Sequence, residues 1–236
     1  MATEAAVAVE GFGLRKVYGL DTSYPVEVLQ GVDVRIRQGE FVAIIGQSGS
    51  GKTTLLNLLG ALDRPTEGRI VLAGADVADL DDNGLADLRN RVVGFVFQFH
   101  YLLPEFTCLE NALMPLAIRH GSAGRADTER VRGLLDRVGL ADQMHKRPGQ
   151  MSGGQQQRAA LIRALANSPR LVLADEPTGN LDARSGQEVF DLMREMTRET
   201  GVAFVMVTHD DRLAQAADRV IHVELGRAHE HTGAEE

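Results

Sequence analysis

The chain has 236 residues, with 33 acidic against 25 basic residues and a net charge of −8 at pH 7. This acidic excess argues against a broad nucleic-acid-binding surface. No apolar run approaches the roughly 18 consecutive residues that a membrane-spanning helix needs. The length suits one large α/β domain, or one core with a smaller attached lobe.

The first residues and the cysteine content bear on the cellular compartment. Residues 1–4 lack the basic-then-apolar pattern of a signal peptide. The single cysteine, Cys108, cannot form an internal disulfide, which agrees with a reducing cytoplasm. Residues 1–8 are small and weakly patterned, so we expect them to be flexible.

Alternating apolar and polar residues mark the amino-terminal part. From residue 9 to residue 37 this alternation runs around turn signals at Gly19 and Gly31, and a further short strand is expected at 68–74. These segments predict an antiparallel β layer. The apolar run 41–45 predicts a buried strand, and the segment that follows it reads as a turn and then a helix.

The pattern turns helical between about residue 107 and residue 166, and then strands return. Apolar runs at 171–174, 203–207 and 220–223 alternate with helical segments, which indicates a largely parallel sheet covered on both faces. We therefore expect one α/β domain over residues 9–226. Its core comprises about 9–98 and 167–226, with a helical lobe inserted at about 99–166. For residues 227–236 a flexible tail is favoured over a metal site at its two histidines.

Residues 46–53 fit the phosphate-binding loop pattern G-x-x-x-x-G-K-[ST], between a strand and a helix as that motif requires. Glycines allow the backbone N–H groups to approach phosphate oxygens closely, and the start of the next helix adds positive potential. Lys52 can reach the β- and γ-phosphates, and the Thr53 hydroxyl can ligate Mg²⁺. The expected nucleotide-binding set here is Gly46, Gln47, Ser48, Gly49, Ser50, Gly51, Lys52, Thr53 and Thr54. The predicted fold class is therefore an α/β phosphate-loop NTPase core with an antiparallel β layer and a helical lobe.

Two adjacent carboxylates, Asp175 and Glu176, end the apolar strand at 171–174. Alone this is a weak signal, because strands often end in a solvated charge. Beside a phosphate loop, an Asp at such a strand end holds Mg²⁺ and the next carboxylate can accept a proton from the attacking water. We assign Asp175 to the metal and Glu176 to general base catalysis.

Residues 152–155 have two compatible interpretations. Ser152 and Gln155 have the spacing of a helix capping box. The exposed N–H groups of the same turn, with the close-approaching pair Gly153 and Gly154, can form a second anion site.

The motifs together resemble those of the ATP-binding-cassette (ABC) ATPases, from about residue 9 to residue 226. The segment Met151–Gln155 resembles the family signature, with Met151 where leucine is commoner. In chain order, the resemblance rests on the phosphate loop, Gln98 at a strand end, the signature, the Asp175–Glu176 pair, residues 179–182 and His209.

The resemblance implies a head-to-tail homodimer that binds two ATP molecules with Mg²⁺. Ser152, Gly153, Gly154 and Gln155 of one subunit would contact the nucleotide on the phosphate loop of the other. It further implies Tyr18 stacking on adenine (with Tyr24 as the alternative), Gln98 ligating Mg²⁺, His209 orienting the attacking water, and Asp182 at the dimer interface.

The segment 97–107, continued by Asn111, Met114 and Pro115, is similar to the ATPase subunits of lipoprotein-releasing systems. Related ATPases for macrolide efflux and cell division share much of it and remain alternatives. The resemblance implies integral-membrane permease partners, two in number, and a place on the cytoplasmic face of the inner membrane. A soluble DNA-repair ATPase is disfavoured, because the chain lacks heptads and cysteine pairs, and no nucleic-acid partner is expected.

Overall fold

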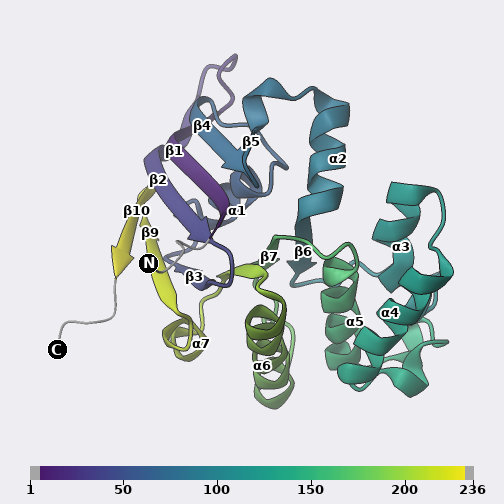
Figure 1. Ribbon diagram of the computed structural model, residues 1–236. Coiled ribbons are helices and arrows are strands. Elements are labelled where there is room, and N and C mark those ends of the chain that lie inside the picture. The colour runs from purple at the N-terminus through teal and green to yellow at the C-terminus, as the bar shows by residue number, and fades with distance from the viewer. Residues whose placement is uncertain (1–5, 232–236) are drawn as a thin grey trace, which may run out of the picture.

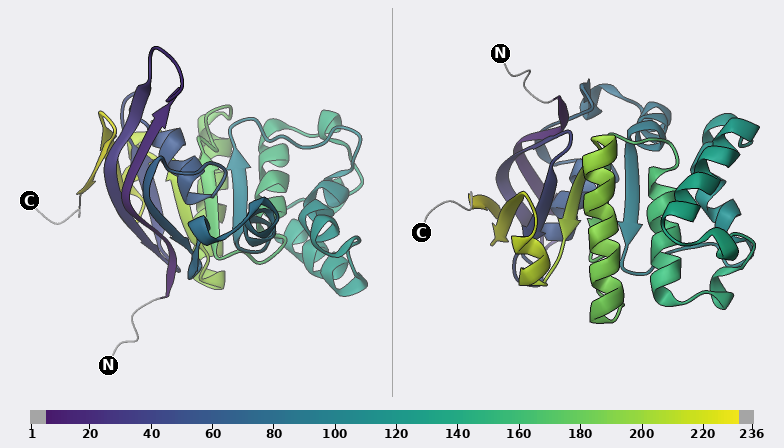
Figure 2. Two further views of the ribbon diagram at one scale, coloured as in Figure 1. Left: turned by 90° about the horizontal axis from the view of Figure 1, so that it is seen from above. Right: turned by 60° about the horizontal axis from the view of Figure 1, so that its bottom comes forward.

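The computed structural model describes residues 6–231, which form two sheets and a helical lobe (Figures 1 and 2). One sheet is antiparallel, with the strand order β2-β1-β4-β5; the other has six strands in the order β10-β9-β3-β8-β7-β6. Within the described residues, no helix combines the length and apolar character needed to cross a membrane. The predicted fold class is confirmed.

The antiparallel sheet comes from the amino-terminal part of the chain. Its strands are β1 (Val7–Tyr18), β2 (Val26–Arg37), β4 (Glu67–Leu72) and β5 (Ala75–Asp76). Gly31, expected at a turn, instead lies inside β2 with φ +81°. Pairing with β1 continues on both sides of it, at Val32 and Gln30, so the glycine bends the strand without ending it.

The six-stranded sheet forms the middle of the molecule. Its strands are β3 (Phe41–Ile45), β6 (Val93–Phe97), β7 (Leu171–Asp175), β8 (Ala203–Val207), β9 (Arg219–Glu224) and β10 (Arg227–His231). All pairings from β9 to β6 are parallel, and only β10 is antiparallel to its neighbour. Both faces of β8 are buried, as its continuous apolar sequence predicts.

Some helices pack on the six-stranded sheet, whereas α3 and α4 pack on other helices in the lobe beside it (Figure 1). The helices are α1 (Lys52–Leu59), α2 (Asp82–Val92), α3 (Cys108–His120), α4 (Arg125–Arg137), α5 (Gly153–Leu165), α6 (Ala183–Thr200) and α7 (Asp211–Gln215). Short 3₁₀ turns lie at Val77–Asp79, Ala141–Gln143 and Pro148–Gln150.

Alternate residues of each central strand enter different apolar cores. Val42 and Ile44 of β3 pack with α1 and the antiparallel sheet, whereas Phe41 packs with α6 and the helical lobe. Phe41 lies edge-on to Phe190 of α6, with ring centroids 5.3 Å apart. The central sheet thus fixes α1, at the phosphate loop, relative to α5 and α6 on the opposite side.

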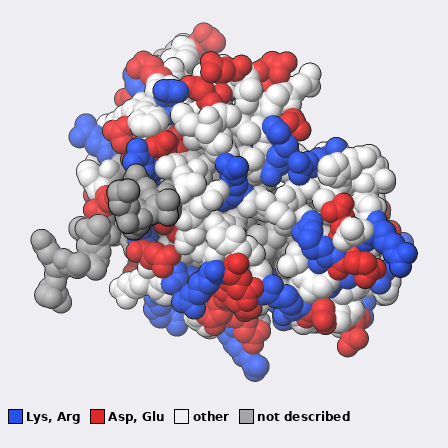
Figure 3. Space-filling view, in the orientation of Figure 1, with Lys and Arg blue, Asp and Glu red and all other residues white. Residues whose placement is uncertain are grey.

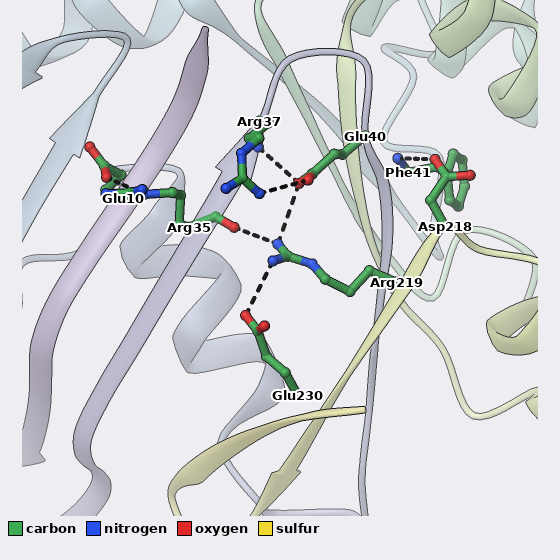
Figure 4. A network of polar contacts seen from close by, with 8 residues as sticks. All are labelled: Glu10, Arg35, Arg37, Glu40, Phe41, Asp218, Arg219 and Glu230. Atoms are coloured by element: carbon green, nitrogen blue, oxygen red, sulfur yellow. Dashed lines mark hydrogen bonds and ion pairs between the residues drawn. The ribbon is translucent and has the colours of Figure 1, made fainter. Parts of the chain in front are cut away.

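The ends of the chain differ from expectation. Val7 and Ala8 belong to β1, and residues 227–231, expected in the flexible terminus, form β10 on the edge of the sheet. The expectations for 1–5 and 232–236 lie outside the described residues. Figure 4 shows the contacts that tie β10 to the rest of the sheet. Arg219 of β9 donates to Glu230 of β10 at 3.2 Å. The same guanidinium donates to Glu40 at 3.4 Å and to the Arg35 carbonyl of β2.

Candidate functional site

The phosphate loop runs from the end of β3 into α1, and two of its glycines are required by the backbone. Gly46 has φ +151°, and a Cβ there would lie 2.1 Å from the Val223 carbonyl oxygen. Gly51 has φ +108°, and a Cβ there would lie 3.0 Å from the Val28 carbonyl oxygen. Any side chain at Gly46 would therefore push the loop off β9, and one at Gly51 would crowd it against β2.

The start of α1 is free to accept an anion. Its N-cap, Gly51, supplies no side-chain hydrogen bond to the first turn. Ser50 Oγ is buried without a hydrogen-bond partner in the described structure. Lys52 Nζ donates to the carbonyls of Gly46 and Gln47, each at 2.8 Å, so its ammonium lies directly over the loop. Open N–H groups, a hydroxyl and a cation together suit a phosphate.

Beside the loop, four predicted site residues line one hollow of about 230 Å³: Thr53, Gln98, Asp175 and Glu176. The Thr53 hydroxyl donates to Asp175 Oδ2 at 3.2 Å. Asp175 ends β7 between β6 and β8, so the parallel register brings Gln98, just after β6, to the same edge. These oxygens from hydroxyl, carboxylate and amide groups fit the ligand preference of Mg²⁺.

The protonation of Asp175 reflects its position. Burial raises the pKa of this carboxyl, and the neighbouring Glu176 charge acts in the same direction. The hydrogen bond from Thr53 and the charge of Lys52 lower the pKa and offset part of that effect. A cation next to Asp175 would favour its ionised form further.

Glu176 is the first residue after β7 and is held by both backbone and side chain. Its φ is +46°, which is unusual for a residue with a side chain, and its N–H donates to the Val207 carbonyl at 3.0 Å. Its Oε2 lies 3.0 Å from His209 Nδ1. The two residues assigned to catalysis are therefore in direct contact.

Gln98 is held by two hydrogen bonds to Asn180. Its amide nitrogen donates to Asn180 Oδ1 at 3.0 Å, and Asn180 Nδ2 donates back to the Gln98 carbonyl at 3.2 Å.

The segment around Gln98 is also bound to α5. Gln157 of α5 donates to the Phe97 carbonyl at 3.2 Å. Arg163 of α5 donates to the carbonyls of His100 and Tyr101 at 2.7 and 2.6 Å. The segment 97–101 is thus bound to α5.

The segment 152–155 starts α5, away from α1 in both figures (Figures 1 and 2). The predicted capping box is confirmed: Ser152 Oγ accepts from the Gln155 N–H, and the Gln155 side chain accepts from the Ser152 N–H. The nearest side-chain atoms to Cβ positions on Gly153 and Gly154 belong to Leu181 and Ser185, both at 3.4 Å. Asp182 caps α6 in the same region. The structure therefore groups 152–155 with Asp182, and neither lines the hollows at the phosphate loop.

The two candidate tyrosines differ in environment. Tyr18 ends β1, with its hydroxyl donating to Asp63 Oδ2 at 3.0 Å, and it is 41% exposed. Tyr24 lies between β1 and β2 and is 87% exposed.

The comparisons with known proteins agree with this geometry. The family model described as "ABC transporter" matches residues 29–179. The chain belongs to the ABC transporter family. It is 53% identical over 225 residues to the lipoprotein-releasing system ATP-binding protein LolD of Anaeromyxobacter dehalogenans, covering 94% of this chain and 93% of the relative. It is 50% identical over 215 residues to LolD 1 of Rhodopseudomonas palustris, covering 91% and 95%.

Solved cassettes of the ABC family have the same fold. A dimeric ATP-binding cassette, MJ0796, in a post-hydrolysis state bound to ADP and Pi, is 38% identical with a TM-score of 0.85. The alignment covers 94% of this chain and 97% of that one. The protein cbiO1 of Clostridium perfringens, part of the ABC transporter complex cbiONQ, is 27% identical with a TM-score of 0.84, covering 95% of this chain and 87% of that one.

This ABC chain also has an apolar groove of about 400 Å³ between α2, α3, β6 and α5. Met114, Pro115 and Ile118 line it from α3, and Phe95 and Phe97 from β6. Asn111 is buried and bonds to the carbonyls of Leu103, Phe106 and Thr107, which fixes the loop leading to α3. Of the residues singled out at 111–115, Met114 and Pro115 thus line the groove, and Asn111 holds the loop before α3.

Sequence reasoning missed three residues that hold site groups in place: Asp63, Asn180 and Arg163. Asn180 stands within the recognised stretch 179–182, so its position was a usable signal. Asp63 and Arg163 act on partners 45 and 62 residues away, and no local pattern marks such contacts.

Proposed function

We propose that this chain is the ATP-hydrolysing subunit of an ABC transporter that releases lipoproteins from the inner membrane for delivery to the outer membrane. The observation that carries the ATPase proposal is the convergence of Thr53, Gln98, Asp175 and Glu176 on one hollow beside the phosphate loop. The lipoprotein-releasing assignment is supported by relatives about half identical over most of their length.

The phosphates of ATP would bind to the loop at residues 46–53 and to Lys52, whose ammonium exchanges carbonyl partners for phosphate oxygens. Thr53, Gln98 and Asp175 would hold Mg²⁺, which when bound neutralises charge on the β- and γ-phosphates. Glu176 accepts the proton of the attacking water. His209, in contact with Glu176, holds that carboxylate and contacts the γ-phosphate.

The segment 152–155 would serve a second copy of the chain. Because it lies on α5 and lines neither hollow at the phosphate loop of its own chain, it would need a second copy to act on a nucleotide, and two copies arranged head to tail would place each Ser152 turn on the other's nucleotide. Asp182, grouped with that turn, would lie at the interface. Dimeric cassettes of the same fold support this arrangement.

The membrane component would be a separate pair of integral-membrane permease subunits. The apolar groove next to the segment 97–101 suits a short amphipathic helix of such a partner. Closure of the ATP-bound dimer would then move that partner from the cytoplasmic face of the inner membrane. On the face drawn in Figure 3, basic and acidic side chains are interspersed, which does not favour a nucleic-acid partner.

The proposal is tested by capture from detergent-solubilised membranes of the source cell with the tagged Glu176→Gln variant and ATP, followed by mass spectrometry. The matched control is the same variant with ADP. We expect, with ATP, a permease pair with large periplasmic domains and trapped lipoproteins. An efflux permease, a cell-division membrane protein or DNA-associated proteins would contradict the lipoprotein-releasing assignment.

A further inference from the structure

Three side chains form one polar cluster where the end of β1, next to the loop of the β1–β2 hairpin, meets the segment after α1. Lys16 Nζ lies 2.7 Å from Asp63 Oδ1, and the Tyr18 hydroxyl donates to Asp63 Oδ2 at 3.0 Å. Lys16 also donates to the Arg64 carbonyl at 2.8 Å, and its ammonium lies 4.8 Å from the centroid of the Tyr18 ring. The two oxygens of the Asp63 carboxylate thus bind Lys16 and Tyr18, which lie on the same side of β1.

Asp63 is itself anchored to the helix that begins at the phosphate loop. The N–H groups of Leu62 and Asp63 donate to the Asn57 carbonyl in α1, at 2.9 and 3.4 Å. On the strand side, Thr66 Oγ1 accepts from the Val17 N–H at 3.0 Å. The cluster therefore joins the end of β1 to the end of α1.

The same strand face lies against the phosphate loop. Lys16 pairs with Leu29 of β2, and Leu29 Cδ2 is 3.0 Å from a Cβ position on Gly51. Tyr18, two residues beyond Lys16, lies on the same side of β1, since both side chains bond to the Asp63 carboxylate. The tyrosine therefore lies at the side of the nucleotide site where β1 and β2 meet the loop.

The Asp63 carboxylate is a strong acceptor. Burial by itself would raise its pKa, but hydrogen bonds from Lys16, the Arg64 N–H and Tyr18 outweigh burial and lower the pKa. An ionised acceptor makes a stronger bond to the phenol than a neutral one. Lys16 lies over the ring, the hydroxyl is bonded to Asp63, and Tyr18 is still 41% exposed, so ring surface remains open to an aromatic ligand while the ring orientation is fixed in advance.

We propose that Asp63 is a positioning residue for the nucleotide base: it holds the Tyr18 ring, through its hydroxyl, so that the face away from Lys16 stacks on adenine. This inference rests on the proposed ATPase function. It selects Tyr18 over the exposed Tyr24, and it ties base binding to the helix that binds the phosphates.

The test is calorimetric titration of ATP and of inorganic tripolyphosphate, which has the phosphates but no base. The variants are Asp63→Asn, Tyr18→Phe, Tyr18→Ala and the double variant Tyr18→Ala with Asp63→Asn; Asp21→Asn, an exposed carboxylate of the same hairpin, is the control. Asp63→Asn should weaken ATP binding about three- to tenfold, the size of the net contribution of one ordinary hydrogen bond, and leave tripolyphosphate binding unchanged. In the Tyr18→Ala background it should have no further effect.

In turnover assays Asp63→Asn should raise KM for ATP and leave kcat within about twofold, because the base does not take part in the reaction. Equal losses for ATP and tripolyphosphate, or no loss for either, would overturn the inference, as would a larger loss from Tyr24→Ala than from Tyr18→Ala. If Asp63→Asn does not fold, Tyr18→Phe, which removes only the hydroxyl, must show the same selective loss. Failure of the unaltered chain to bind ATP would instead overturn the proposed function.

Discussion

At the scale of single residues, Glu176 is fixed by its surroundings before any ligand arrives. Its left-handed backbone conformation, at φ +46°, follows directly on a strand, and its carboxylate is in contact with His209. A residue with a side chain keeps such a conformation only where neighbours hold it. Here the N–H bond to Val207 and the contact with His209 do so, which aims the carboxylate into the hollow with Thr53 and Gln98.

We expect Glu176→Gln to lower the ATP turnover rate at least about 100-fold, because an amide of the same shape cannot accept the proton. ATP binding should persist, since the phosphate loop is unchanged. The measurement is steady-state phosphate release, with Glu188→Gln on the exposed side of α6 as control. A rate equal to that of the unaltered chain would remove Glu176 from the role of base.

Cys108 should resist thiol reagents until the chain unfolds. The residue is fully buried at the start of α3, and burial raises the pKa of its thiol to about 11, from 9.0. Since the raised pKa belongs to the folded state, the related stability is present below pH 9.0 and is lost as pH rises toward about 11. Labelling with a chromogenic disulfide at pH 8, with and without urea, checks this; equal rates in both would contradict it.

Residue types in the motifs could be predicted because each carries its own chemistry. The phosphate loop, the two carboxylates after an apolar strand and the capping box at Ser152 are all readable in a few consecutive letters. The contacts of Asp63 and Arg163 could not be predicted, because they join segments that only folding brings together.

At the scale of elements, α5 connects three parts of the proposed mechanism. Its first turn is the segment expected to act on a second copy, and its Gln157 and Arg163 hold the segment that carries Gln98. Arg163 also lines the groove proposed for a membrane partner. A movement of α5 therefore moves all three together.

Arg163→Met should uncouple these parts. Two charged hydrogen bonds to His100 and Tyr101 are lost, so amides around 98–103 should exchange with solvent faster, and kcat should fall by about fivefold or more while ATP affinity is kept. Arg163→Lys should not restore kcat, because one ammonium cannot span both carbonyls in the guanidinium geometry. The exposed Arg119→Met is the control. Unchanged exchange and kcat would contradict the coupling.

The type of an element could be predicted where the apolar pattern was clear. Where the pattern was unclear, the predicted ends of the elements were wrong. The buried strands at 41–45, 171–175 and 203–207 follow from continuous apolar runs. Gly31 was expected at a turn because glycine marks turns and strand bends alike. The strand β10 has a polar sequence, and its stability comes from pairing with β9 and from the Arg219 contact with Glu230, which sequence alone does not show.

At the scale of the whole molecule, the phosphate loop leads into α1 and the segment 152–155 starts α5, and we propose that a second copy of the chain brings the two together around one nucleotide. The central sheet, with α1 on one side and α5 and α6 on the other, keeps that separation fixed. ATP would therefore act as a shared ligand across two chains, and its hydrolysis would remove the contacts that hold them closed.

The most direct measurement of this central claim is the molar mass of purified Glu176→Gln in solution, by light scattering, with ATP and Mg²⁺ and then with ADP. The structure and the proposed mechanism predict a mass twice that of the 25.6 kDa chain with ATP, and the mass of one chain with ADP. The dimer should disappear when Lys52→Ala or Ser152→Tyr is added. Lys52→Ala removes a phosphate contact, and Ser152→Tyr places a bulky side chain between the 152–155 turn and the nucleotide of the second copy. A single-chain mass under all conditions, or a dimer indifferent to nucleotide and to Ser152→Tyr, would contradict it.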